Sequence, residues 1–270
     1  MLKQCRSPYR SFLALLSAVI LWMASFQVVQ ASTAPEITTI GEAINQAGRQ
    51  RMLTQRMLKY YALAGQDVRA RHSLEALKEA EELYESQIAR LKAYVQDDNV
   101  QRQLTEAESL WNTVKPTFQA APNRDQVMTL YTNNEALLAA HQQIVLSLEK
   151  LAGSKTSELV NMAGRQRMLS QRIAASYALM SWGFENEMTN NYDKAMSDMD
   201  SALSYLSSNP SNSSAVSSYL ADARQNYHRL SRSSEAAEKA VYVPGLIDRS
   251  AEKILESMNE VTKLYAEALQ

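Results

Sequence analysis

The sequence predicts an all-α protein, with two tandem antiparallel four-helix bundles that follow an N-terminal signal peptide. Three observations support this fold class: scarce Gly and Pro, long stretches with apolar residues at helical spacing, and an internal duplication. The 270 residues include only 7 Gly and 6 Pro, which is too few for a turn-rich β-sandwich or barrel. No convincing run of alternating strand residues appears along the chain.

Charge and cysteine content exclude several other classes. The 28 Lys and Arg are nearly balanced by 29 Asp and Glu, so we expect no nucleic-acid partner, because such proteins are usually strongly basic. Hydrophobic residues make up 46% of the chain, which is too high for a disordered protein. A single Cys can form neither a disulfide framework nor a multi-Cys zinc site.

Residues 1–31 have the pattern of a signal peptide. Three basic residues precede an apolar run over 11–29, and Ala31 supplies a small residue for cleavage before Ser32. We therefore expect secretion through a cleaved signal, with an uncleaved membrane anchor over 11–29 as the alternative. Loss of those three basic residues leaves 25 Lys and Arg against 29 Asp and Glu, so a bound anion must be captured locally.

One segment of the chain occurs twice. Residues 44–57 read INQAGRQRMLTQRM and residues 160–173 read VNMAGRQRMLSQRI, identical at ten of fourteen positions and offset by 116. Trp111 falls on Tyr227 at the same offset. The duplication therefore covers most of a domain.

We predict a first domain over 36–152 and a second over 153–270. The offset of 116 also places three apolar residues of the first domain on three of the second: Leu138, Val145 and Leu148 on Ile254, Val261 and Leu264.

Each domain reads as four helices with short connections, the pattern of an antiparallel bundle. In the first domain the predicted helices cover 36–65, 67–95, 99–115 and 126–152, and Pro116 is expected to close the third. The second domain repeats this plan, with turns at 207–210 and 243–245. Gly153-Ser154 can either end one helix and start the next, which lets the bundles lie side by side, or sit within one continuous rod.

The duplicated motif suggests an anion site. On a helix, Gly48, Arg51 and Gln55 share a stripe, and Gly164, Arg167 and Gln171 repeat it. Two such helices packed through their glycines would bring Arg51 and Arg167 together, and a small planar oxyanion between the guanidinium groups would relieve their repulsion. The alternatives are a solvated or Glu-paired Arg, or a motif kept for helix packing alone.

The string N-x-A-G-R-Q-R-M-L-[ST]-Q-R resembles the hallmark of the PilJ/NarX-like N-terminal sensor domain, in both halves of the chain. That domain is the periplasmic four-helix module of nitrate/nitrite sensor kinases and of some chemoreceptors, including the type IV pilus transducer. The resemblance implies a periplasmic location and makes Arg51 and Arg167 the candidate anion ligands, with Gly48 and Gly164 as the family's glycines. Arg56 and Arg172 match the family's downstream Arg and are expected to support the site. We also expect supporting roles for four neighbouring motif residues: Arg49, Gln55, Arg165 and Gln171.

The chain departs from that family by carrying two modules, which could stand in for the sensor dimer, and we expect no output domain of its own. The leading hypothesis is a periplasmic sensor-type or accessory protein for a small oxyanion, with nitrate or nitrite favoured. The competing hypothesis is a ligand-free helical module that docks on a membrane receptor, pilus component or transporter. In either case a membrane sensor, chemoreceptor or transporter is the expected partner. We expect neither an enzyme nor a cofactor, and no metal site, because none of the three His residues has a Glu three positions before it.

Overall fold

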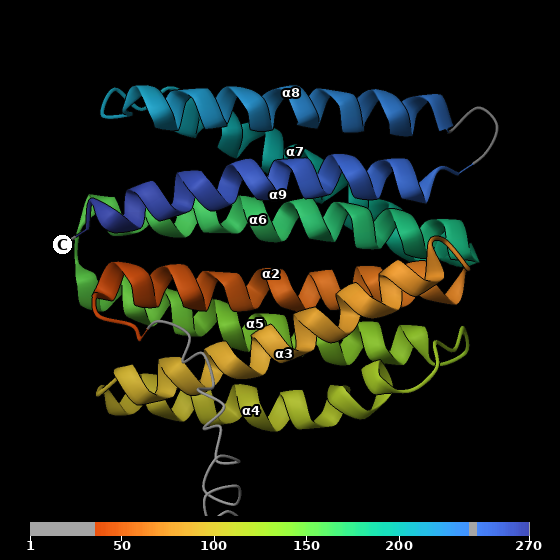
Figure 1. Cartoon of the computed structure of the whole chain (residues 1–270), viewed down its shortest axis with the longest axis horizontal. Helices are drawn as coiled ribbons and strands as arrows, with labels where there is room; N and C mark the ends of the chain where they lie inside the picture. Colours follow the sequence, from red (N-terminus) through yellow and green to blue (C-terminus); the bar gives the residue numbers. More distant parts are fainter. Residues whose placement is uncertain (1–35, 238–241, 270) are drawn as a thin grey trace, which may run out of the picture. The chain divides into compact units, whose positions relative to one another are not determined.

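The computed structural model describes residues 36–237 and 242–269, which are helical apart from short connections and contain no strand (Figure 1). The all-α prediction is therefore confirmed. Ile37–Gln270 forms one compact unit. The expected signal peptide, residues 1–31, lies outside the described residues. Among the helices that are described, none is both long and apolar enough to cross a membrane.

The first half contributes α2 (Ile40–Gly65), α3 (Ala70–Tyr94), α4 (Asp98–Gln119) and α5 (Val127–Ala152). The second half contributes α6 (Lys155–Leu179), the π-helical turn η1 (Met180–Phe184), α7 (Glu185–Ser207), α8 (Ser214–Ala237) and α9 (Pro244–Glu267). Local chemistry explains several starts. Thr39 accepts from the Glu42 amide at 3.2 Å to cap α2, and Pro244 occupies the first turn of α9.

The expectation that Pro116 closes the third helix is wrong. Helix α4 continues to Gln119, and the Ala120 amide donates to the Pro116 carbonyl at 3.1 Å. Proline costs one intrahelical hydrogen bond because it has no N–H. Val114 and Phe118, on either side of it, are buried in the core, and their burial offsets that cost by holding the last turn in place.

The connection between the halves is a turn, and the continuous-rod alternative is wrong. Gly153 ends α5 with a left-handed φ of 62°. Ser154 then caps α6, and Ser157 completes a reciprocal capping box with it. The chain therefore folds back, and α6 lies alongside α2 over an extensive contact (Figure 1).

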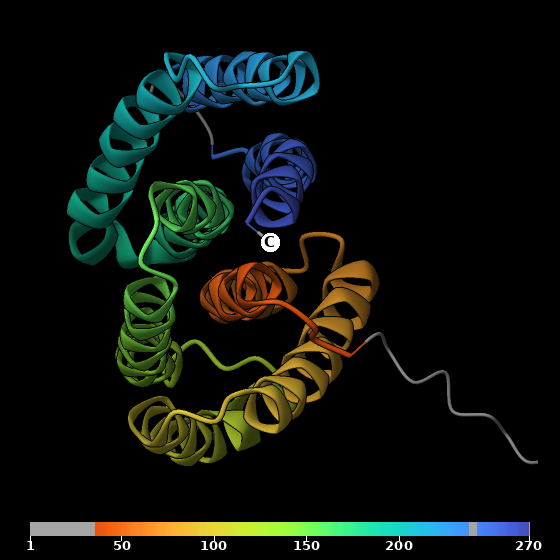
Figure 2. The ribbon, with the colours of Figure 1, turned by 90° about the vertical axis from the view of Figure 1, so that its left-hand side faces the viewer.

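Helices from both halves surround the two motif helices, α2 and α6. Figure 2 shows α2, α5, α6 and α9 about the centre of the compact unit, with α3 and α4 flanking one side and α7 and α8 the other. Helix α2 packs on α3, α5, α6 and α9, so it is buried on almost every face from Ala43 to Ala64. Polar motif side chains on these faces are therefore carried into the interior.

The buried positions show that the two halves are not related by a constant offset. Trp111 of α4 and Tyr227 of α8 are both buried and stand 116 positions apart, as the sequence indicated. Tyr84 of α3 corresponds to Met199 of α7, which is 115 positions away. Length changes in the connections shift the numbering of a whole helix without disturbing its buried face.

The fourth helices, α5 and α9, correspond at 117 positions. At this offset, eight buried positions of α5 fall on buried positions of α9, including Leu138 on Leu255 and His141 on Met258. At 116 the buried Leu130 would instead fall on Leu246, which is 46% exposed. The sequence alignment of Leu138, Val145 and Leu148 with Ile254, Val261 and Leu264 is therefore wrong by one residue.

Candidate functional site: a buried arginine pair between the motif helices

Helices α2 and α6 approach each other closely at their glycines. A Cβ added to Gly48 would lie 4.0 Å from the Gly164 Cα and 3.3 Å from the Nη2 atoms of both Arg51 and Arg167. A Cβ added to Gly164 would lie 3.2 Å from Arg167 Nη2 and 3.5 Å from Arg51 Nη2. The four residues predicted from the motif are thus brought together, and both guanidinium groups occupy the space left by the missing side chains.

Arg51 is fully buried and bonded only to neutral groups. Its Nη1 donates to Gln142 Oε1 at 2.6 Å, and its Nη2 donates to the Asn161 carbonyl at 3.4 Å. Its Nε has no hydrogen-bond partner. A buried donor without an acceptor costs about 1–3 kcal/mol, so this guanidinium has unmet bonding capacity.

Arg167 makes the equivalent contacts, from α6 to groups on α2 and α9. Its Nη1 donates to Asn45 Oδ1 at 2.9 Å and to Asn259 Oδ1 at 3.3 Å, and its Nη2 donates to the Asn45 carbonyl at 3.0 Å. Its Nε is also buried without a partner. Because Asn45 and Asn161 stand at equivalent motif positions, the two arginines form a pseudo-twofold pair in which each bonds to the motif helix of the other half.

No carboxylate neutralises this pair within the described part of the chain, where neither arginine is in an ion pair. Burial, assisted by the Arg165 guanidinium and partly opposed by Glu149, lowers the pKa of Arg51 to about 9. Burial also lowers the pKa of Arg167 well below its ordinary value, assisted by Arg49 and Arg51. Each positive charge is therefore held at a cost that a counter-ion would remove.

A buried histidine adds to the polar surroundings of the pair. His141 is fully buried on α5, and its Nε2 lies 2.8 Å from the Tyr84 hydroxyl. Burial, followed by the charge of Arg51, lowers the pKa of His141 to about 3. The imidazole is therefore neutral at neutral pH and adds no positive charge.

Two of the predicted supporting residues, Arg56 and Arg172, link the halves. Arg56 of α2 pairs with Glu252 of α9 at 3.0 Å, and Arg172 of α6 pairs with Glu135 of α5. Gln55 also donates to Glu135, at 2.9 Å. These guanidinium groups already have carboxylate partners. We therefore expect them to hold the helices together around the central arginines rather than to bind a ligand.

Of the other supporting residues, the two glutamines are equivalent and the two arginines are not. Gln171 hydrogen-bonds to Glu252, as Gln55 does to Glu135. Arg165 pairs with Asp198 at 3.0 Å. Arg49, its counterpart, is in none of the ion pairs found in the described residues and lines a hollow in the surface.

The sequence interpretation missed the amide partners of the arginine pair. Asn45 and Asn161 lie within the identical part of the motif, so their duplication was a usable signal. Gln142 and Asn259 gave no such signal, because they are different residue types 117 positions apart, outside the alignment at 116. The equivalence of Glu135 and Glu252 was also missed, because these residues align only at an offset of 117.

The fold and the motif together define a tandem, sensor-type helical module. A model of the PilJ family, type IV pili methyl-accepting chemotaxis transducer N-term, matches residues 37–138 and 153–267. The chain therefore belongs to the PilJ family and contains two copies of its domain. No curated protein and no solved structure matches the chain.

Proposed function

We propose that this protein is a periplasmic sensor-type or accessory protein that binds a small oxyanion, of the nitrate or nitrite class, between α2 and α6. Arg51 and Arg167 are the ligands, and Gly48 and Gly164 allow the two guanidinium groups to lie between the helices. The occupied and empty states would be read by a membrane sensor, chemoreceptor or transporter. The PilJ membership supports the sensor-type role, and the arginine geometry supports the anion.

The observation that carries this proposal is the convergence of two fully buried guanidinium groups, neither of which is in an ion pair with any described residue. Two like charges in a low-dielectric seam repel, and burial penalises each of them separately. Helix packing alone does not require arginine there, since apolar residues of similar volume would avoid both penalties. A negatively charged ligand would offset both penalties, and this would explain why arginine occupies these two positions.

The donor arrangement suits a small planar anion. Each guanidinium has a buried Nε–H without an acceptor, and each has an Nη2 beside the glycine contact. Planar guanidinium forks match planar oxyanions through paired hydrogen bonds. The asparagine and glutamine partners are neutral, so they orient the arginines without cancelling their charge.

Thermal unfolding with and without sodium nitrate tests this function on the mature protein. A ligand at one hundred times its Kd stabilises the native state by about 2.7 kcal/mol. For a chain of this size that corresponds to a rise in the unfolding midpoint of about 5–10 °C. We expect such a rise with nitrate or nitrite, and none in the Arg51→Ala/Arg167→Ala variant.

The control variant is Arg71→Ala/Arg102→Ala, which removes the same charge from two exposed positions on α3 and α4. It should respond to nitrate as the unmodified protein does. Calorimetric titration gives the affinity directly. The anion function is wrong if the protein shows no binding at millimolar nitrate or nitrite, or if binding persists unchanged in the double variant. Either result would favour the ligand-free docking module.

A further inference from the structure

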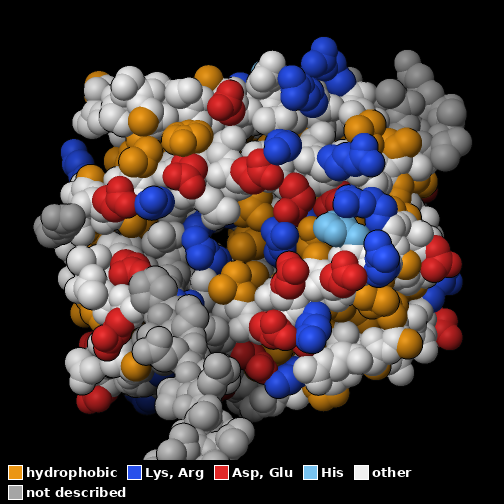
Figure 3. All heavy atoms as spheres, in the orientation of Figure 1, with side chains coloured by type: hydrophobic (Ala, Val, Ile, Leu, Met, Phe, Trp, Pro, Cys, Tyr) orange, Lys and Arg blue, Asp and Glu red, His pale blue; other side chains and the backbone are white. Residues whose placement is uncertain are grey.

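A surface hollow of about 290 Å³ lies beside the arginine pair, lined by residues of α2, α3 and α9. It could hold a small planar oxyanion with several waters, because a water molecule in the liquid occupies about 30 Å³. Figure 3 shows Lys and Arg side chains gathered with hydrophobic side chains between α9 and α3 on this face. The lining residues that matter here are Arg49, Leu83, Leu255 and Asn259.

Asn259 connects this hollow to the buried pair. It lines the hollow, and its Oδ1 accepts the hydrogen bond from Arg167 Nη1 at 3.3 Å. The side chain is partly exposed, unlike the fully buried Arg167. A rotation of this one amide would release a donor of Arg167 toward the hollow.

Arg49 gives the hollow a positive group that has no carboxylate partner among the residues that the structure describes. Arg56, also in the lining, is paired with Glu252, and Glu79 is an exposed residue of α3. Burial lowers the pKa of Arg49 and Arg90 lowers it further, while Arg49 in turn lowers that of Arg167. Arg49 and Arg167 therefore belong to one region of positive potential.

The equivalent place in the second half is closed by ion pairs. Arg165, the counterpart of Arg49, bonds to Asp198 at 3.0 Å, and Lys194 reaches the same carboxylate at 3.4 Å. Helices α3 and α7 correspond at 115 positions, so Leu83 stands where Asp198 does. A leucine in the first half thus leaves Arg49 available, where an aspartate in the second half engages Arg165.

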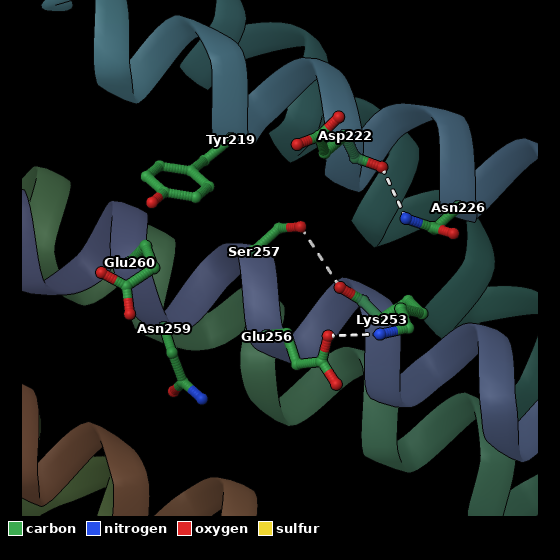
Figure 4. Close-up of a pocket in the computed structure, with 8 residues that line it drawn as sticks. All are labelled: Tyr219, Asp222, Asn226, Lys253, Glu256, Ser257, Asn259 and Glu260. Atoms are coloured by element: carbon green, nitrogen blue, oxygen red, sulfur yellow. Dashed lines mark hydrogen bonds and ion pairs between the residues drawn. The ribbon is translucent and has the colours of Figure 1, made fainter.

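The hollow on the other side of Asn259 is unsuited to an anion. It lies between α8 and α9 and is lined by Asp222, Glu256 and Glu260, with Lys253 bonded to Glu256 at 2.7 Å (Figure 4). In the same view the Asn259 amide points away from α8 and toward α2. An anion that approached from this acidic side would be repelled.

We propose that the hollow among α2, α3 and α9 is the entrance through which the oxyanion reaches the arginine pair. Arg49 captures the anion there, and Asn259 is the gate between the entrance and Arg167. This inference rests on the proposed function, since it concerns how the same ligand arrives. It makes the two halves unequal: the site is pseudo-symmetric, but access to it is from the first half.

The test exchanges the residue that differs between the halves. Leu83→Asp should pair with Arg49 as Asp198 pairs with Arg165, and so occupy the entrance. Nitrate is titrated into the protein, and association and dissociation rates are obtained from two-dimensional NMR line shapes. We expect the association rate for nitrate to fall about three- to ten-fold, the range expected when one steering charge is neutralised.

Two variants complete the design. Arg49→Gln should slow association similarly, while Arg165→Gln, its counterpart across the pseudo-twofold axis, should leave the association rate within two-fold of the unmodified value. If nitrate binds but Leu83→Asp and Arg49→Gln do not slow it, or if Arg165→Gln slows it equally, the entrance is wrong and the proposed function stands. If nitrate binds none of the proteins, including the unmodified one, the proposed function fails first and the entrance with it.

Discussion

The α2–α9 contact and the α6–α5 contact are equivalent positions of the two halves, yet they are built differently. Both contain one cross-half ion pair, Arg56 with Glu252 and Arg172 with Glu135. Only the α2–α9 contact adds a fully buried Lys59, which forms ion pairs with Asp248 at 2.7 Å and with Glu252 at 2.6 Å. At the other contact the corresponding residues are Ala175 and Tyr131.

The comparison shows that the centre of the site is the same in both halves, whereas the contacts around it differ. The central arginines and their asparagine partners are the same in both halves, so the centre has kept its pseudo-twofold symmetry. The contacts away from the centre have diverged in charge and in size. Burial alone lowers the pKa of Lys59, but Glu252 and Asp248 outweigh it and raise that pKa, so the cation is firmly held.

The largest effect is expected from breaking the contact that has the buried lysine. Lys59→Met would leave Asp248, only 2% exposed, with the more distant and partly exposed Arg69, at 3.4 Å, as its remaining cation. Removing one partner of a buried ion pair costs about 3–5 kcal/mol. We expect a loss of that size in the free energy of unfolding, measured by urea denaturation.

The matched control gives the α2–α9 contact the residues that are found at the α6–α5 contact. The double variant Lys59→Ala/Asp248→Tyr copies Ala175 and Tyr131, and should recover about half of the loss or more, because no buried charge remains unpaired. A double variant no more stable than Lys59→Met would contradict this account of the difference.

A second effect distinguishes the fourth helices. His141 of α5 is matched by Met258 of α9, so only one half contains a buried imidazole. Its pKa is lowered from 6.5 to about 3 in the folded protein. Stability from this group is therefore complete above pH 6.5 and is lost as the pH falls from 6.5 toward 3, where only the unfolded chain binds the proton. At pH 5 the loss is about 2 kcal/mol.

Urea denaturation at pH 7 and pH 5 measures this effect, with His141→Met as the variant that copies Met258. The carboxylates contribute equally to both proteins, so the difference between the two pH dependences isolates the imidazole. We expect the variant to lose less stability on acidification. Identical pH dependences in the two proteins would show that His141 is not desolvated as the structure indicates.

The smallest effect is expected at the surface of the second half. Asp198→Leu gives α7 the residue that α3 has at Leu83 and removes the pair with Arg165, whose side chains are 52% and 28% exposed. Exposed pairs contribute about 0.2–1 kcal/mol. Thermal unfolding should therefore show a shift of at most about 4 °C. A larger shift would mean that the Arg165–Asp198 pair makes a substantial contribution to the packing of α6 on α7.

Much of the fold followed from local sequence. Helical spacing placed the helices to within a few residues, although the connection at Gly153-Ser154 was left open. The turn predicted at 243–245 is wrong for Pro244 and Gly245, which begin α9. Pro116 was another exception, because burial of Val114 and Phe118 overrides the cost of one missing hydrogen bond. The order of Gly, Arg and Gln in the duplicated motif also predicted which residues would meet, since an α-helix fixes their relative directions.

The sequence by itself determined the all-α class and the two copies, and it identified Arg51 and Arg167 as the residues that would meet if the motif helices packed together. These features depend on composition and on spacing along a single helix. Tertiary structure alone decided which groups surround that pair. Gln142 and Asn259 come from helices far away in the chain, and Leu83 and Asp198 distinguish the surroundings of Arg49 and Arg165 only after α3 and α7 are aligned by their buried faces. Such contacts depend on how whole helices shift against one another, and that shift is set by packing over their entire length rather than by any local pattern of residues.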